Sequence, residues 1–134
     1  MRVLRLTMNS NYDEIKTLVS KALNFFTYEC YITDEKLLFM LEFALRELVI
    51  NGIEHGNNMI EDKKVRCIIC DSKKRIIITV KDEGEGFILE RFLSKYNESI
   101  LRERKRGIST IMEMGFSVRV KRNRITVTKT KENF

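Results

Sequence analysis

Alternating polar and apolar side chains predict strands at both ends of the chain and in its middle. Residues 2–8 alternate in this way, as the residues of a half-buried strand do. The same pattern recurs in two pairs of segments, 64–70 with 75–81 and 116–121 with 124–130. Only a short polar turn separates the members of each pair, and such a spacing is typical of hairpins.

Two segments between the first and second predicted strands repeat their apolar side chains at intervals of three and four, as helices do. The first begins at Ser10 or Asn11, and its single apolar stripe is formed by Ile15, Leu18, Val19, Ala22, Leu23 and Phe26. The second covers about residues 34–55 and is apolar on most sides, which places it deep in the protein. We expect Thr33 to cap this helix and Gly56 to end it.

The region after the central hairpin carries the less regular segments. Residues 82–87 form a glycine-rich loop, residues 88–95 a short helix, and residues 96–105 a polar, charged and mobile segment. A further helix is expected over residues 107–114, ending at Gly115. Helices that are segregated from adjacent antiparallel strands indicate an α/β (α+β) two-layer sandwich.

Length and composition place residues 1–134 in one domain. The chain is 43% hydrophobic and 33% charged, which supplies both a core and a soluble surface. No apolar run reaches the length of a membrane span, the N-terminus does not resemble a secretory signal, and three cysteines cannot all pair in disulfides. We therefore expect a cytoplasmic protein.

The net charge of +6 is unevenly distributed along the chain. Residues 101–134 hold ten Lys and Arg against three Asp and Glu, whereas residues 1–100 hold fifteen against sixteen. A basic C-terminal third suits a polyanion, which includes nucleic acid, a nucleoside triphosphate and an acidic partner protein. The alternative is a solvated, lysine-rich surface.

Glu47, Asn51 and His55 are spaced by four residues and therefore lie along one face of the second helix. A carboxylate in an apolar helix is costly unless a polar or charged group meets it. Such a carboxylate can accept a proton from a nucleophile, and an amide oxygen can coordinate Mg²⁺. The alternative is that the helix surfaces here and that Arg46 or a lysine pairs with Glu47.

A second cluster, Asp82-Glu83-Gly84-Glu85-Gly86-Phe87, directly follows a predicted strand. Glycines at a strand end let the backbone approach a ligand closely, and an aspartate there can accept a hydrogen bond from an exocyclic amine. The sequence lacks the Gly-Lys-Ser/Thr of a P-loop and the third glycine of a dinucleotide fingerprint. Ordinary turn chemistry remains the alternative.

A third cluster places four cations before a glycine that is expected to open a helix, in Arg102-Glu103-Arg104-Lys105-Arg106-Gly107-Ile108. The N-terminus of a helix presents free N–H groups and a positive partial charge, which suit phosphate oxygens. A solvated basic loop is the alternative.

Taken in this order, the three clusters resemble the GHKL, or Bergerat-fold, ATPases. The segment from Glu47 to Asn51, continued by His55 and Gly56, resembles their N box, and Asp82-x-Gly84-x-Gly86-Phe87 resembles their first glycine box. Arg106-Gly107-Ile108-x-x-Ile111 resembles the second glycine box, in the short form of the bacterial anti-sigma factor serine-protein kinases. The resemblance covers about residues 2–130 and implies a mostly antiparallel mixed sheet with helices on one face.

The resemblance also implies a role for each matching position. Glu47 would be the general base that takes the proton of a substrate serine, and Asn51 would hold Mg²⁺ on the phosphates of ATP. Asp82 would bind the adenine amino group in a loop shaped by Gly84, Gly86 and Phe87. The lid and helix start that meet the phosphates would comprise Arg104, Lys105, Arg106, Gly107 and Ile108.

The implied function is that of an ATP-dependent serine/threonine-protein kinase that acts as an anti-sigma factor. Such a protein binds a sigma factor, phosphorylates a STAS-type anti-sigma antagonist on serine and often acts as a homodimer. Direct contact with nucleic acid or with a membrane is not implied. The alternatives are a regulatory ATP-binding module of the same fold without kinase activity, and a basic nucleic-acid binder.

The sequence departs from the family pattern at two positions. Lys105 stands where the second glycine box usually has a glycine, which bears on lid closure and on catalytic rate. Gly52 stands where the family usually has alanine, and a glycine inside a helix costs about 1 kcal/mol relative to alanine. A close approach of the backbone to the nucleotide or to a neighbouring strand is one explanation for Gly52.

Overall fold

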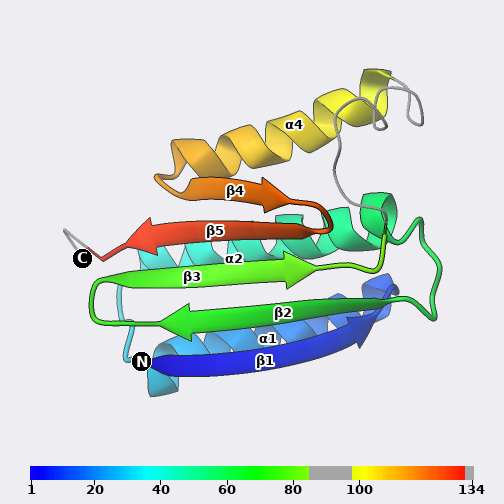
Figure 1. The fold of residues 1–134 in the computed structure, drawn as a ribbon. Helices are drawn as coiled ribbons and strands as arrows, with labels where there is room; N and C mark the ends of the chain where they lie inside the picture. The colour runs from blue at the N-terminus through cyan, green and yellow to red at the C-terminus, as the bar shows by residue number, and fades with distance from the viewer. Residues whose placement is uncertain (85–97, 132–134) are drawn as a thin grey trace.

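A five-stranded sheet carries two helices on one of its faces (Figure 1). The structure is a computed structural model that describes the backbone of residues 1–84 and 98–131 and the side chains of residues 1–84 and 106–131. The strands are β1 (Arg2–Asn9), β2 (Lys64–Asp71), β3 (Arg75–Lys81), β4 (Ser117–Lys121) and β5 (Arg124–Thr130). They are arranged in the order β1-β2-β3-β5-β4.

All the predicted strands are present, and their limits differ from the prediction by no more than one residue. Each pairing among the described strands is antiparallel, so the parallel component of the expected mixed sheet is not found in them. The α+β sandwich is confirmed. Strand β3, which leads into the glycine-rich loop, lies at the centre of the sheet.

Two helices pack behind the sheet, and both end in a wider turn. A 3-10 turn (Tyr12–Glu14) precedes α1 (Ile15–Asn24), and a π turn (Phe25–Glu29) follows it. Helix α2 (Glu35–Asn51) continues into a second π turn (Gly52–Gly56), so the predicted end at Gly56 is confirmed. The predicted Thr33 cap is wrong, because Asp34 has extended backbone angles and its Oδ1 accepts from the N–H of Leu37 at 3.0 Å.

Helix α4 (Glu98–Glu113) begins nine residues earlier than predicted. The backbone of residues 98–105 is helical, in contrast to the polar, mobile segment expected there. This stretch has no glycine or proline and is rich in Leu, Glu, Arg and Lys, which are good helix formers. The predicted end at Gly115 is confirmed by its φ of +94°. The predicted helix at residues 88–95 lies outside the described residues.

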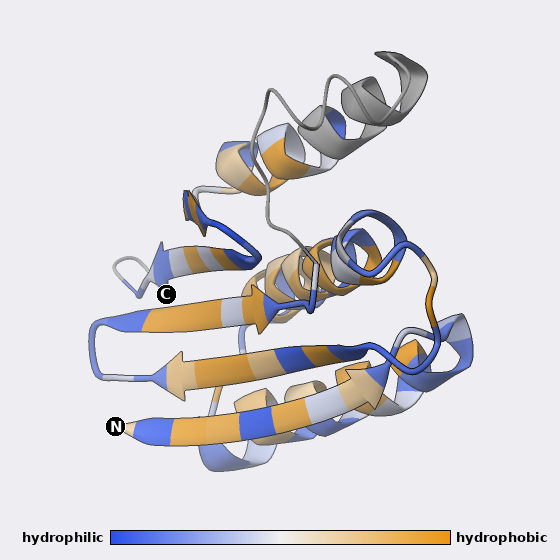
Figure 2. Ribbon diagram, turned by 45° about the vertical axis from the view of Figure 1, so that its right-hand side comes forward, coloured by the Kyte–Doolittle hydropathy of each residue, from blue (hydrophilic) through white to orange (hydrophobic). Residues whose placement is uncertain are grey.

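The core lies between the sheet and the helices, and α2 contributes most to it. Leu41, Ala44, Leu45 and Val49 have no exposed surface, and α2 is hydrophobic over most of its length in Figure 2. Among the described residues, no helix has both the length and the apolar character that a bilayer span requires.

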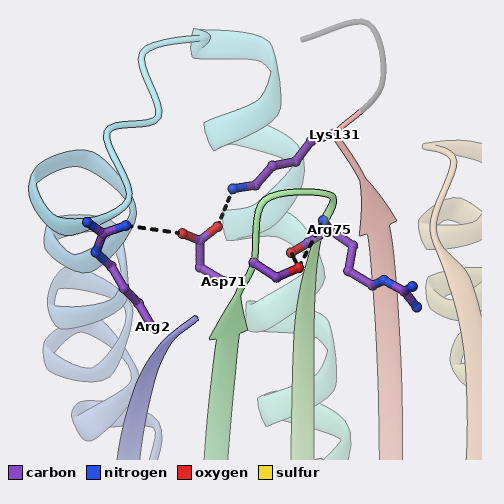
Figure 3. Close-up of polar contacts among 5 residues, drawn as sticks. Arg2, Asp71, Arg75 and Lys131 are labelled. Carbon is purple, nitrogen blue, oxygen red and sulfur yellow. Dashed lines mark hydrogen bonds and ion pairs between the residues drawn. The ribbon is translucent and has the colours of Figure 1, made fainter.

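Asp71 ties three chain segments together at one end of the sheet (Figure 3). It ends β2, is 4% exposed, and forms an ion pair with Lys131, which follows β5. Arg2, at the start of β1, lies 4.0 Å from its other carboxylate oxygen. The pairing fixes the chain beyond β5 against the start of the sheet.

Candidate functional site

A cleft lies between α2 and α4 and brings together two of the sequence clusters. Its volume is about 380 Å³, which falls in the range of small-molecule sites. The residues that line it are Phe43, Glu47, Ile50, Asn51, Glu54, His55, Arg106, Gly107 and Thr110. We call this the Glu47 cleft.

Glu47 faces the backbone of Gly107 across the cleft. A β-carbon at position 107 would lie 2.5 Å from Oε2 of Glu47, so a larger residue there would require the end of the Glu47 side chain to shift. Burial, and then the negative charge of Glu54, raise the pKa of Glu47 above its ordinary value of 4.5. Such a carboxyl is a stronger proton acceptor than one in water, as a general base requires.

Pairing between Arg46 and Glu47, the alternative explanation of the first cluster, is not found. Arg46 lies 3.6 Å from Glu42, one turn back along α2. No described cation forms an ion pair with Glu47. Among the side chains that the structure describes, no positive charge therefore balances this carboxylate.

Asn51 lies one helical turn beyond Glu47 and is 5% exposed. Its Nδ2 is buried and has no hydrogen-bond partner among the described residues. A buried polar atom without a partner costs about 1–3 kcal/mol, and a ligand oxygen would remove that cost. The unpaired amide is therefore suited to a polar ligand in the cleft.

Asp82 follows β3 and lies against the C-terminal end of α2. A β-carbon on Gly56 would overlap the carboxylate of Asp82. A β-carbon on Gly52 would lie 3.8 Å from the β-carbon of Asp82. Oδ1 of Asp82 accepts from the N–H of Gly84 at 2.8 Å. A β-carbon on Gly84 would in turn overlap the carbonyl group of Gly56. The helix end and the loop are thus in direct backbone contact.

Two asparagines that sequence reasoning did not select fix this loop. Asn57 is completely buried, and its Oδ1 accepts from the N–H of Glu83 at 2.7 Å. Its Nδ2 donates to Ser10 Oγ and to the carbonyl of Lys64, both at 2.9 Å. Asn123, in the turn between β4 and β5, donates to the carbonyl of Asp82 at 2.6 Å. The available sequence signals were only an asparagine beside a helix-ending glycine and one in a hairpin turn.

The second glycine box is placed differently from the prediction. Gly107 is the tenth residue of α4, so its N–H is not one of the free amides of a helix N-terminus. The prediction of a phosphate site at a helix start is therefore wrong, because α4 begins earlier in the chain than Gly107. Arg106 is exposed and lines the cleft, whereas Ile108 is half-buried and does not line it.

Several predicted site residues lie outside what the structure describes. Gly86 and Phe87 are not described, and neither are the side chains of Arg104 and Lys105. Glu47, Asn51, Arg106 and Gly107 share one cleft, while Asp82 and Gly84 lie against the adjoining helix end.

The residues of the cleft fit a magnesium–nucleotide better than a protein-bound metal. The described residues contain no group of three His, Cys, Asp or Glu side chains that could hold an ion. Mg²⁺ is usually bound by one or two protein oxygens together with substrate phosphates and water. Asn51 supplies one amide oxygen that can serve in this way, and its buried nitrogen, which has no partner among the described residues, is a donor suited to a ligand oxygen.

Comparison with known proteins assigns this arrangement to a family. The sequence pattern of the histidine kinase-like ATPase domain matches residues 9–130, which is most of the chain. A search of curated proteins found no significant match. The match includes α2, the Asp82 loop and the described part of α4, the three elements that form the site. The chain therefore belongs to the histidine kinase-like ATPase domain family of the GHKL superfamily.

Proposed function

We propose that this ATP-binding GHKL module is a serine-protein kinase that acts as an anti-sigma factor. It would bind a sigma factor and transfer the γ-phosphoryl group of ATP to a serine of a STAS-type antagonist. The observation that supports this most is the Glu47 cleft. There an acidic side chain with a raised pKa lies beside a buried amide whose nitrogen has no hydrogen-bond partner among the described residues.

Glu47 is proposed as the general base. Its carboxylate accepts the proton of the substrate hydroxyl while that oxygen attacks phosphorus, and the bond from phosphorus to the leaving ADP oxygen breaks. A raised pKa makes the carboxylate a better proton acceptor, and partial burial is the larger cause of that shift. Its contribution is expected to be about 10²–10⁴-fold in rate.

Asn51 and Arg106 are proposed to bind the phosphates from opposite walls of the cleft. When bound, Mg²⁺ would neutralise phosphate charge and align the oxygens for transfer. Asn51 offers one amide oxygen to the ion and one amide N–H to a phosphate oxygen. Arg106 is exposed at the mouth of the cleft and supplies a positive charge.

Asp82 is proposed to bind the adenine amino group. Its Oδ1 accepts from the N–H of Gly84, and a carboxylate can accept several hydrogen bonds at once. The backbone contact between Gly56 and Gly84 keeps this loop close to the end of α2. The adenine ring would then lie next to the end of α2, about one turn beyond Asn51.

One observation favours the alternative of an ATP-binding regulatory module without kinase activity. Oε2 of Glu47 lies close to the backbone of Gly107, so the present position of α4 crowds one side of the oxygen that a serine hydroxyl would have to reach. A protein in which α4 keeps this position would bind nucleotide without transferring phosphate.

The test is incubation with γ-labelled ATP, Mg²⁺ and a purified STAS-type candidate substrate, with phosphoserine mapped by mass spectrometry. The kinase proposal expects phosphoserine from the wild type and a loss of at least about 100-fold with Glu47→Gln, whose ATP affinity should persist. Asp82→Asn should weaken ATP binding about tenfold or more in an equilibrium titration. Binding of ATP without phosphoserine on any candidate would support the regulatory module.

Sedimentation measurements should show a homodimer, the state that the proposed function favours. A monomer at all concentrations would contradict that part of the proposal without affecting nucleotide binding.

A further inference from the structure

The face of the sheet opposite α1 and α2 is strongly basic. Figure 1 looks onto this face, and both helices lie behind the strands. Side chains alternate along each strand, so every second residue points away from the core. Seven exposed cations occupy such outward positions, namely Arg5, Arg66, Arg75, Lys81, Arg119, Lys121 and Arg124. We call this the basic sheet face.

Four of these cations form one row across four neighbouring strands. The register pairs Arg66 with Lys81, Lys81 with Arg124, and Arg124 with Lys121. Neighbouring strands are about 4.8 Å apart, so the positive charges follow one another at close intervals. Like charges placed directly opposite each other destabilise a sheet, which gives the row a cost in the free protein.

Nothing in the described part of the protein balances this charge. The outward positions of the five strands include no Asp or Glu, since Asp71 is the only acidic strand residue and points into the core. None of the seven cations forms an ion pair with a described carboxylate. A negatively charged partner would therefore relieve repulsion and gain attraction at once.

The basic sheet face also contains a hollow, and partly exposed apolar side chains lie on the same face. The hollow has a volume of about 510 Å³ and is lined by Arg75, Ile77, Ser117, Val118, Arg119, Lys121, Arg124, Thr126 and Thr128. Towards β1, two apolar side chains, Val3 and Ile68, stand among the outward residues, and Ile68 is paired with Arg5. Val3 is 36% exposed and Ile68 is 37% exposed. Arginine mixed with partly exposed aliphatic side chains is typical of protein interfaces.

From this arrangement we infer that the basic sheet face binds an acidic, amphipathic helix of a partner protein. The apolar stripe of such a helix would cover Ile68 and Ile77, and its carboxylates would meet Arg119, Lys121 and Arg124. A second copy of this chain is disfavoured on this face, because it would oppose cations with cations. Single-stranded nucleic acid is disfavoured too, because the outward positions of the described strands hold no aromatic side chain for base stacking.

The inference is independent of the proposed kinase activity. The Glu47 cleft lies between α2 and α4, whereas the basic sheet face is formed by β-strands and includes none of the cleft residues. Binding to the face is therefore expected with or without ATP. Loss of nucleotide binding through Asp82→Asn should leave it unchanged.

The test uses three fluorescent probes whose binding is followed by anisotropy. One is a helical peptide of about 20 residues with leucines at i, i+3 and i+4 flanked by glutamates, long enough to form a helix on binding. The second is a scrambled isomer without the apolar stripe, and the third is a single-stranded oligothymidylate of equal charge. The wild type should bind the amphipathic peptide about tenfold more tightly than either of the other probes.

Charge reversal locates the binding site. Lys121→Glu combined with Arg124→Glu should weaken peptide binding about tenfold or more. Lys16→Glu combined with Lys21→Glu, two exposed positions on α1, makes the same change in net charge and should leave affinity within about twofold. Equal losses in both double variants would reduce the effect to net charge and overturn the inference.

A milder variant covers the case in which the reversed pair fails to fold. Ile68→Thr keeps a β-branched residue at a partly exposed strand position. It should weaken the amphipathic peptide several-fold and leave the scrambled isomer unaffected. Equal or tighter binding of the scrambled peptide or of the oligonucleotide, or no binding of any probe, would overturn the inference.

Discussion

The carboxylate of Asp82 occupies the space into which a side chain of Gly56 would extend. A β-carbon built on Gly56 would overlap Cγ and Oδ2 of Asp82. Gly56 ends the helix that carries Glu47 and Asn51, and Asp82 follows the central strand of the sheet. This contact, together with the hydrogen bonds of Asn57 and Asn123 to the loop, holds the proposed adenine-binding residue beside the helix that carries the proposed phosphate-binding residues.

Gly56→Ala should displace Asp82 and weaken ATP binding. Overpacking of this kind typically costs about 1–3 kcal/mol of stability, which urea unfolding would measure. Gly52→Ala is the matched control, because Gly52 has helical angles and its β-carbon would lie 3.4 Å from Val65, an ordinary contact. It should be neutral or stabilise the protein by up to about 1 kcal/mol. Normal ATP affinity in Gly56→Ala would show that Asp82 does not depend on this contact.

The Gly52→Ala variant also tests why this chain has glycine where the family usually has alanine. Nothing in the described surroundings of Gly52 excludes an alanine, since its nearest neighbour would be Val65 Cγ1 at 3.4 Å. The suggested close approach to a neighbouring strand is therefore not what requires glycine there.

Glu47→Gln should stabilise the protein at neutral pH while abolishing transfer. The folded-state pKa of Glu47 is raised, so the folded protein holds this proton more tightly than the unfolded chain does. The stability contributed by the protonated form is complete below the ordinary value of 4.5 and is lost as the pH rises through the folded pKa. The advantage of the variant should consequently be larger at higher pH, which would appear as a larger increase in Tm over the wild type.

Thermal unfolding at acid and at mildly alkaline pH would measure this difference. Glu54→Gln provides a second variant, because removal of its charge lowers the pKa of Glu47 while burial, the larger cause, continues to raise it. The pH dependence should therefore become smaller and not disappear. An advantage of Glu47→Gln that is independent of pH would contradict the assignment.

Asn57→Ala should be strongly destabilising. The substitution removes two hydrogen bonds donated by Nδ2 and leaves the N–H of Glu83 without its acceptor. Each unsatisfied buried group costs about 1–3 kcal/mol, and a fall of that size or more in the free energy of unfolding is expected. Ser10→Ala removes one acceptor of Asn57 and the hydrogen bond that Ser10 Oγ donates to the carbonyl of Lys63, but Glu83 keeps its acceptor, so the effect on urea unfolding should be smaller. Equal effects would show that the loop does not depend on Asn57.

Local patterns were sufficient to predict most of the fold. Polar and apolar side chains alternate along the strands with a period of two. Helix α2 is apolar on most sides, so it is expected to lie in the core. Competition between local signals explains the errors. A glycine at position 107 suggested a helix start, but the preceding stretch of helix formers carries α4 through it. At the N-terminus of α2, two adjacent residues can act as caps, and the structure uses Asp34.

The site was predictable only where one motif held the residues close together. Glu47 and Asn51 are one turn apart on a helix, so their common face followed from their spacing. Asn57 and Asn123 act on the Asp82 loop from 26 and 41 residues away, and nothing local in the sequence reveals such partners. The contact of Gly107 with Glu47 depends on how two helices pack, which periodicity does not determine.

The buried ion pair at the end of the sheet yields a prediction that does not involve the site. Lys131→Met would leave the carboxylate of Asp71, which is 4% exposed, without its main partner. Because Lys131 is itself partly exposed, we expect a loss of about 1–3 kcal/mol on urea unfolding. Adding Asp71→Asn should restore part of that loss, since the unpaired charge is then gone. A double variant less stable than Lys131→Met alone would contradict this account.

The rate at which Cys30 is alkylated should depend on the ion pair between Asp71 and Lys131. Its pKa is raised to about 12, first by burial and then by the charge of Asp71 and a hydrogen bond to it, while Lys131 lowers it. Asp71→Asn should therefore lower the Cys30 pKa and speed alkylation by iodoacetamide, whereas Lys131→Met should raise the pKa and slow the reaction. Cys67, whose pKa burial alone raises to about 12, is the internal control and should react only on unfolding. Mass spectrometry of labelled peptides separates the thiols, and equal rates for Cys30 in both variants would mean that Asp71 and Lys131 do not act on it electrostatically.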